Sequence, residues 1–401
     1  MSLRDKSRAL LLHHIPSPQI IALKIQRRRY ARAATWEIYV HSLVRQAGPC
    51  AEVVALHEYF LHDGHICMAF QKHAGSLESA LRRGPLPLAR VRRVTRQILT
   101  ALERLHRCGY AHTDIKPDNI LYDPRTGDAR LADLGSATDR LGDAGSLGTR
   151  EYRPPEAIIG APLSLKMDLW SLGCTVFEML TGRLLFSPRR VAARKYREFS
   201  DDAPPTELAA SALADDAEEL AEQLHAADLV AGKYRLESEL GRGRFGTVWS
   251  AHMLHDQPLA TSHEPIWKHA EALEQIPRPK TERDLADRAW KREKGADDLL
   301  DLALNYEHLL LIAALRGPIP ADMIAAARYR ASHFEPDGAP RFRPKIRRIT
   351  LRERLRRGST LSGSAGAEAA AFLHQLLATD PASRATAATA LDHPWLRDVA
   401  P

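Results

Sequence analysis

A glycine-rich run, Gly241 to Gly246, lies in the second half of the 401 residues of this chain and restricts the folds open to it. Apolar and polar residues alternate on both sides of it, from Lys233 to His252, which predicts a β-hairpin with the glycines at its turn. Glycine at such a turn allows another group to approach the backbone closely. Residues 206–229 and 264–301 have helical patterns, so the hairpin has no partner strand beside it in the sequence.

A dense group of polar residues lies well before the hairpin. His112, Asp114, Lys116 and Asn119 fall within one short segment, and Asp133 follows a short predicted strand. Phosphoryl transfer needs a carboxylate that orients the acceptor hydroxyl, a cation near the moving phosphate and oxygen ligands for Mg²⁺. Asp114, Lys116 and the pair of Asn119 and Asp133 can supply these groups in turn. Chance explains each residue alone, whereas their order and spacing together favour a phosphotransfer site that uses ATP and Mg²⁺.

The remaining patterns predict a strand-rich beginning and a mostly helical remainder. The strand over 19–25 is apolar and carries one lysine, Lys24; an unpaired buried ammonium is costly, so a functional role is favoured for it. Besides the hairpin and the short strand before Asp133, the expected elements are strands over 19–25 and 65–70, helices over 30–45, 88–107, 165–180, 206–229 and 264–301, and further helices over 306–397.

The composition narrows the class of protein. Apolar residues make up 44% and charged residues 27%, which is ordinary for a soluble globular protein. No apolar run approaches the roughly 18 residues of a membrane span, so none is expected. The four cysteines form no C-x-x-C pair, which predicts reduced thiols and a cytoplasmic location.

Much of the net charge of +7 comes from a basic stretch over residues 341–357. A nucleic-acid arm is one interpretation of this stretch. Because Phe342 is its one aromatic residue, a solvated or internally paired helical face is favoured instead. No nucleic-acid partner is therefore expected.

Several longer motifs resemble the catalytic domain of eukaryotic-type protein kinases, and within them the CMGC group, in the branch of the SR-protein kinases and Cdc-like kinases. Residues 112–121, HTDIKPDNIL, have the SR-protein-kinase form of the catalytic loop, and residues 168–174 match a D-x-W-S-x-G-C helix. Residues 148–156 resemble the substrate-pocket segment, and residues 380–386 resemble a segment near the end of the domain. The resemblance covers residues 20–186 and 306–397. It implies a bilobal α+β fold, with a small, mostly antiparallel β lobe that carries one helix and a large helical lobe.

The resemblance also implies roles for single residues. Lys24 resembles the lysine that holds the α and β phosphates of ATP, and Glu37 resembles its partner on the following helix. Glu156 and Arg384 stand where the family has a buried ion pair. The implied nucleotide contacts are Leu240, Gly241, Gly243, Phe245, Gly246, Val248, Ala22, Lys24, Phe70, Gln71, His73 and Leu121.

The order of the motifs departs from the family, in which the glycine hairpin immediately precedes the lysine strand. We expect the hairpin to complete the small-lobe sheet beside the strand of Lys24. A chain of this size has a diameter of about 55 Å, and the linker of about 46 residues before the hairpin is roughly 69 Å long as a helix, so the hairpin can reach. One alternative is exchange of the hairpin with a neighbouring protomer, which would give a dimer in place of the expected monomer. The expected division is 1–72 for the small lobe, 73–186 for the first part of the large lobe, 187–305 for an insertion that contains the hairpin at 233–252, and 306–401 for the last helices.

Two positions bear on regulation and substrate. Thr113 stands where most kinases carry the arginine that reads a phosphorylated activation loop, so activity without that phosphorylation is expected. Lys116 resembles the serine/threonine-specific members, which implies a protein substrate phosphorylated on Ser or Thr. The acidic stretch over 201–228 can attract basic, arginine-rich peptides, although a solvated linker helix is favoured.

Three functions stay open at this point. The leading one is an active serine/threonine protein kinase. A pseudokinase, a binding module without turnover, is disfavoured by the intact Lys24, Asp114, Asn119 and Asp133. A small-molecule kinase of the aminoglycoside-phosphotransferase type is disfavoured by the Arg-Pro-Pro-Glu segment and the D-x-W-S-x-G-C helix, although fold alone does not fix the substrate.

Overall fold

The computed structural model describes residues 19–141, 147–188, 224–242, 246–255, 297–341, 348–359, 361 and 363–397. These residues form two compact units. The first holds residues 19–41, 54–73 and the described part of 224–255, and the second holds 42–53, 74–188 and the described residues from 297 onward. Gly243 and Phe245 lie outside the described residues, as do most of the helices expected over 206–229 and 264–301.

The first unit is a six-stranded antiparallel sheet with most of one long helix, α2 (Ala31–Gln46), whose residues from Ser42 onward belong to the second unit. A single 3-10 turn, Arg28–Tyr30, connects the helix to the first strand. The order across the sheet is β2-β3-β1-β8-β7-β6. The strands are β1 (Gln19–Gln26), β2 (Leu56–His62), β3 (His65–Gln71), β6 (Leu229–Val230), β7 (Tyr234–Arg242) and β8 (Gly246–Met253).

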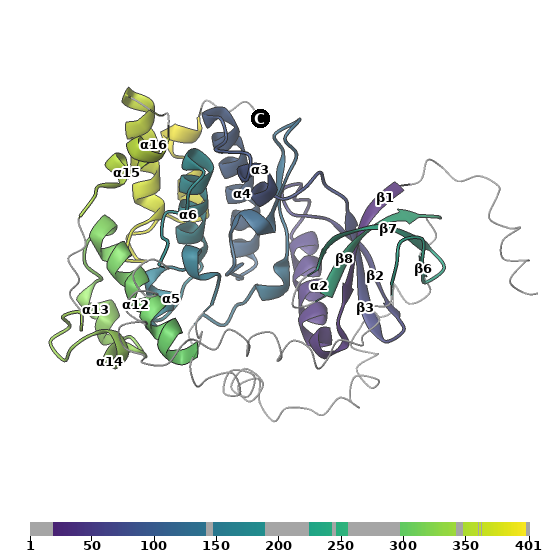
Figure 1. Cartoon of the computed structure of the whole chain (residues 1–401), viewed down its shortest axis with the longest axis horizontal. Helices are drawn as coiled ribbons and strands as arrows, with labels where there is room; N and C mark the ends of the chain where they lie inside the picture. Colours follow the sequence, from purple (N-terminus) through teal and green to yellow (C-terminus); the bar gives the residue numbers. More distant parts are fainter. Residues whose placement is uncertain are drawn as a thin grey trace, which may run out of the picture. The chain divides into compact units, whose positions relative to one another are not determined.

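The glycine-rich hairpin is the pair β7 and β8, and it pairs with the lysine strand of the same chain. Strand β8 runs antiparallel to β1, with Lys24 opposite Val248 and Gln26 opposite Gly246. Figure 1 shows this as purple β1 beside green β7 and β8, two parts of the chain that are far apart in sequence. The sequence-based expectation that the hairpin lies beside the strand of Lys24 agrees with this pairing.

Apolar side chains on one face hold the six strands together. Alternate residues of β1, Ile21, Leu23 and Ile25, are buried in a core that also receives Trp249 from β8 and Phe60 from β2. Because side chains alternate between the two faces of a strand, Ala22 and Lys24 lie on the opposite face. The core therefore fixes which residues of the hairpin share a face with Lys24.

Two glycines of the hairpin differ sharply in their surroundings, which gives a stability prediction. A Cβ at Gly246 would collide with the carbonyl oxygen of Ile25, whereas a Cβ at Gly241 would meet nothing within 4 Å. Gly246→Ala is therefore expected to lower the free energy of unfolding by about 1–3 kcal/mol, and Gly241→Ala to leave it nearly unchanged. Urea denaturation of the two variants measures this difference. Equal effects would show that β1 and β8 do not approach as described.

The second unit is mostly helical around two long helices, α4 (Leu88–Arg107) and α6 (Met167–Thr181). The expected helix over 88–107 is confirmed at both ends, and the one over 165–180 is shifted by two residues at its start. Trp170 of α6 stacks on Phe186, with ring centroids 5.9 Å apart, and both side chains are fully buried. The other helices among the described residues are α3 (Leu77–Leu81), α5 (Pro155–Ile159), α12 (Asp297–Arg316), α13 (Ala321–Ala325), α14 (Arg330–His333), α15 (Leu351–Gly358), α16 (Gly363–Leu376) and α17 (Ala387–Leu391). None of these helices, nor any other in the described ranges, has the length and apolar character needed to cross a membrane.

One prediction from the sequence is wrong in the residues that the structure describes. The helix predicted over 206–229 does not extend to its last residues, because Leu229 and Val230 form the short strand β6 against β7. Val230 is fully buried in the core of the sheet. Pairing and burial there outweigh the helix propensity of the preceding residues, which is a weak preference.

Candidate active site

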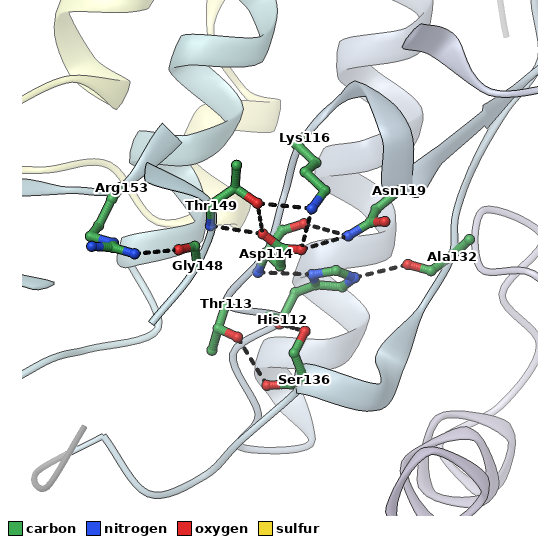
Figure 2. Close-up of polar contacts among 10 residues, drawn as sticks. All are labelled: His112, Thr113, Asp114, Lys116, Asn119, Ala132, Ser136, Gly148, Thr149 and Arg153. Atoms are coloured by element: carbon green, nitrogen blue, oxygen red, sulfur yellow. Dashed lines mark hydrogen bonds and ion pairs between the residues drawn. The ribbon is translucent and has the colours of Figure 1, made fainter. Parts of the chain in front are cut away.

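The carboxylate of Asp114 lies at the centre of a set of polar contacts in the second unit (Figure 2). The Nζ atom of Lys116 is 2.8 Å from its Oδ2 atom. The backbone nitrogen of Thr149 and the Oγ1 atom of Thr149 donate to its Oδ1 atom at 2.9 and 2.6 Å. The amide nitrogen of Asn119 donates to Oδ2 at 3.0 Å and to the backbone oxygen of Asp114 at 2.9 Å. Both carboxylate oxygens are thus held in fixed directions.

These contacts determine the charge of Asp114. Burial alone raises the pKa of this carboxyl, but the hydrogen bonds from Lys116 and Thr149 and the charge of Lys116 outweigh burial and lower the pKa below its usual value. Asp114 is consequently ionised at neutral pH and can accept a hydrogen bond from a hydroxyl group.

A small hairpin brings Asn119 and Asp133 to the same place. Asn119 immediately precedes β4 (Ile120–Tyr122), and Asp133 follows β5 (Ala129–Leu131), which pairs antiparallel with β4. The backbone nitrogen of Ala132 donates to the oxygen of Asn119 at 2.9 Å. The side chain of His112 connects this hairpin to Asp114. Its Nε2 atom bonds the oxygen of Ala132 at 3.0 Å, and its Nδ1 atom accepts from the backbone nitrogen of Asp114.

Thr113 has an unfavourable backbone conformation that a buried carboxylate supports. Its φ angle is 70°, which is rare for a β-branched residue. The carboxylate of Asp168, from α6, accepts hydrogen bonds from the backbone nitrogens of His112 and Thr113 at 2.7 and 2.8 Å. A Cβ at Gly148 would lie 2.6 Å from the oxygen of Thr113, so glycine is required there as well. Strain of this kind persists where surrounding contacts enforce it, and such places are often functional.

Thr149 is the residue of this group that sequence reasoning missed. It contacts both Asp114 and Lys116, the latter through a 2.8 Å hydrogen bond from Nζ to Oγ1. The signal that the sequence offers is its position within residues 148–156, which resemble the substrate-pocket segment of the family. Arg153 supports the same segment, since its guanidinium donates to the oxygens of Leu147 and Gly148.

The first unit holds the second set of expected site residues. The Nζ atom of Lys24 lies 3.0 and 2.8 Å from the two carboxylate oxygens of Glu37, which is almost completely buried on α2. The expected pair is therefore present. It satisfies the ammonium that the sequence places on an apolar strand, and it fixes the direction of the Lys24 side chain.

The expected nucleotide contacts are divided between the two units. In the first unit Ala22 pairs with Phe70 on one side and with Ser250 on the other, and Val248 lies opposite Lys24. Leu240 is half exposed near the tip of β7. Gln71 ends β3 and is exposed, and His73 follows it in the same unit. Leu121 lies on β4 in the second unit.

Comparison with known proteins was consistent with these arrangements. A family model described as "Protein kinase domain" matches residues 6–228, more than half of the chain. The chain belongs to the protein kinase family. The first unit carries the strand with Lys24, and the second carries the loop with Asp114.

The kinase is also similar to several curated proteins. "Serine/threonine-protein kinase prp4" of Schizosaccharomyces pombe is 36% identical over 143 residues, which are 34% of this chain and 30% of that protein. "Homeodomain-interacting protein kinase 1" of Caenorhabditis elegans is 36% identical over 179 residues, 42% of this chain and 21% of that protein. "Homeodomain-interacting protein kinase 2" of Mesocricetus auratus is 35% identical over 179 residues, 42% of this chain and 15% of that protein. The matched segments thus span less than a third of each relative.

Protein kinases generally use ATP and Mg²⁺, and the side chains present fit that use. The amide nitrogen of Asn119 donates to Asp114, so the amide oxygen is the atom that would bind a metal. Asp133 supplies a carboxylate next to it in the fold. The described residues contain no cluster of three or more His, Cys, Asp or Glu that could hold a metal alone. Mg²⁺ bound together with substrate phosphates needs only one or two protein carboxylates, so this ligand set suits it.

Proposed function

We propose that the protein is an ATP-dependent protein kinase of the CMGC group that phosphorylates serine or threonine in a protein substrate. The observation that carries the proposal is the set of contacts around Asp114, whose ionised carboxylate is fixed by Lys116 and Thr149 and lies beside Asn119. A positioned carboxylate, a cation and oxygen ligands for a metal are the groups that phosphoryl transfer requires.

Each of the site residues has its own role in phosphoryl transfer. Asp114 orients the acceptor hydroxyl, because its lowered pKa keeps it ionised and its oxygens have fixed directions, and it accepts the proton as the phosphoryl group is transferred. Lys116 lies 2.8 Å from Asp114 and neutralises charge on the transferred phosphate. Lys24, held by Glu37, binds the α and β phosphates of ATP. Asn119 and Asp133 hold Mg²⁺, which when bound supplies charge neutralisation of the triphosphate.

Transfer of radiolabel from ATP to serine, threonine and tyrosine peptides tests this function directly. We expect label on serine or threonine peptides with the wild-type chain and none with Asp133→Ala. Binding of ATP without transfer by the wild type would favour the pseudokinase alternative. Transfer to small hydroxylated molecules but to no peptide would favour the small-molecule kinase.

We further propose that activity does not require phosphorylation between residues 135 and 156. In support, the catalytic loop is bonded directly to the start of this segment. Thr113 Oγ1 donates to the oxygen of Ser136 at 2.9 Å, Ser136 Oγ donates to the oxygen of His112 at 3.2 Å, and Ala111 forms a bridge with Thr138. Treatment of the purified protein with a phosphatase is therefore expected to leave kcat unchanged, as measured by peptide phosphorylation. Loss of activity that returns on rephosphorylation would contradict this proposal.

Arginine-flanked serines are the proposed substrate class. Burial raises the pKa of Glu178, and the nearby carboxylates of Asp118, Glu78 and Glu151 raise it further, so these acidic side chains add to the negative field of the unit that holds Asp114. Such a field attracts basic peptides. Peptides that differ only in Arg or Gln on either side of the serine measure the preference. Equal kcat/KM values for the two series would remove this part of the proposal.

The proposed working form is a cytoplasmic monomer in which the hairpin serves its own chain. All four cysteines are free, in keeping with a reducing compartment, and β8 pairs with β1 of the same chain. Size-exclusion chromatography with light scattering tests the monomer. Mixing a Gly246→Ala chain with an Asp133→Ala chain tests hairpin exchange, since restored activity in the mixture would require a hairpin supplied by a second protomer.

A further inference from the structure

The displaced hairpin poses a problem of register. Its strands β7 and β8 join β1 from a distant part of the sequence, so no short connection sets their alignment. Closing a long loop costs only slightly more than closing a short one, but a long loop gives no information about register. A slip by one residue would turn Val248 away from the face that carries Lys24. Some side-chain contact must therefore define the alignment.

The contact that fits this role joins the two outer parts of the sheet. Lys233, in the turn between β6 and β7, has a side chain only 3% exposed, and its Nζ atom lies 2.6 Å from Oε1 of Glu58. The hydroxyl of Tyr234 donates to the same oxygen of Glu58. Glu58 belongs to β2, at one end of the strand order, whereas Lys233 and Tyr234 belong to the other end. We refer to Glu58, Lys233 and Tyr234 as the clasp.

Neighbouring groups fix the positions of the clasp residues along their strands. The backbone nitrogen of Lys233 donates to the oxygen of Val230, and its backbone oxygen accepts from Leu254, just beyond β8. The ring of Tyr234 stacks on Phe60 of β2, with centroids 5.6 Å apart and planes 9° from parallel. Glu58 itself lies at a register shift between β2 and β3. A shift of the hairpin along β1 would separate two buried donors from their shared acceptor.

The energetics favour a role in alignment over one in stability. A buried ion pair often contributes little net stability compared with apolar side chains of similar volume, whereas breaking one partner leaves an uncompensated charge. The apolar core of Phe60, Leu236 and Trp249 holds the hairpin to the sheet in any case. The clasp adds a free-energy cost to every register of the hairpin on β1 except the observed one.

We propose that the clasp positions the displaced hairpin for nucleotide binding, with Lys233 and Glu58 as positioning residues for ATP. This inference rests on the proposed kinase function. When the clasp is lost, only part of the population has the hairpin aligned, and the apparent affinity for ATP falls by that fraction. Molecules that have bound ATP transfer phosphate normally, because Asp114, Lys116 and Asn119 belong to the other unit.

The test uses full-length Lys233→Met and Glu58→Gln, with Arg235→Met as a control. Arg235 is an exposed cation on β7 outside the clasp. Both clasp variants are expected to raise KM for ATP by about fivefold or more while kcat changes by less than about twofold. Amide hydrogen exchange over residues 247–252 is expected to accelerate in the clasp variants and to match wild type in the control.

A double variant separates alignment from stability. Lys233→Met combined with Glu58→Met replaces both charges by apolar side chains, so the free energy of unfolding is expected to return to the wild-type range. The raised KM and the fast exchange should remain. A return of both to wild type, or an unchanged KM in folded single variants, would overturn the proposal. If the wild-type chain transfers no phosphate, the kinase function fails, and hydrogen exchange still decides whether the clasp aligns the hairpin.

Discussion

Asp114→Asn is expected to lower kcat for peptide phosphorylation by about 10²- to 10⁴-fold, the range typical of a lost general base. The amide keeps the size of the side chain but cannot accept a proton from the substrate hydroxyl. The contacts that Asp114 now accepts from Lys116 and Thr149 would also be weakened, since the acceptor is no longer charged. Steady-state kinetics with a serine peptide measure the loss.

Two comparisons make this result specific. Asp123→Asn changes a partly exposed carboxylate in the turn between β4 and β5, which bonds local groups such as Arg125, and should leave kcat unchanged. Binding of ATP to Asp114→Asn should match wild type, because Asp114 is not among the expected nucleotide contacts. A variant that keeps at least about a tenth of the wild-type kcat would show that Asp114 neither orients nor deprotonates the acceptor.

The sequence predicted those parts of the structure that depend on local pattern. The helix over 88–107 was predictable at both ends because its apolar residues recur with helical spacing and are buried together. Asp114, Lys116, Asn119 and Asp133 were predictable as one group because their spacing matches what the chemistry requires. The location of the hairpin was predictable because neither element had a partner strand beside it in the sequence. The strand of Lys24 lacked a neighbouring strand, and the glycine-rich hairpin lacked a sheet to join.

Features that depend on contacts between distant residues were not predictable. Thr149 lies 35 positions from Asp114, and nothing in its own segment shows that both its nitrogen and its hydroxyl bond that carboxylate. Lys233 is 3% exposed, although an acidic stretch before it suggests a solvated linker. The strand at Leu229 and Val230 exists because β7 offers an open edge, which is a property of the assembled sheet. In each case the deciding partner is remote in sequence.

Arg384→Met is expected to destabilise the second unit by about 3–5 kcal/mol, the usual cost of leaving one buried charge without its partner. The guanidinium of Arg384 binds both oxygens of Glu156 at 2.5 and 2.9 Å, and both side chains are fully buried. It also donates to the oxygens of Ala378 and Lys166, so its loss leaves several acceptors unsatisfied. Urea denaturation followed by tryptophan fluorescence reports the change, because the guanidinium lies 5.2 Å from the ring of Trp170.

A second Arg–Glu ion pair serves as a control for the cause of the lost stability in Arg384→Met. Arg357 binds Glu353 within α15, but both side chains are partly exposed, so Arg357→Met should leave the free energy of unfolding nearly unchanged. Arg384→Lys should recover little, since an ammonium cannot bind both oxygens of Glu156 at once. Arg384→Met combined with Glu156→Met should lose less than the single variant, because the uncompensated carboxylate is gone. If the double variant were as unstable as the single one, the loss of stability would come from lost packing and lost backbone contacts. The ion pair of Glu156 and Arg384, which are 228 positions apart, would then not be the interaction that holds these two distant segments of the unit together.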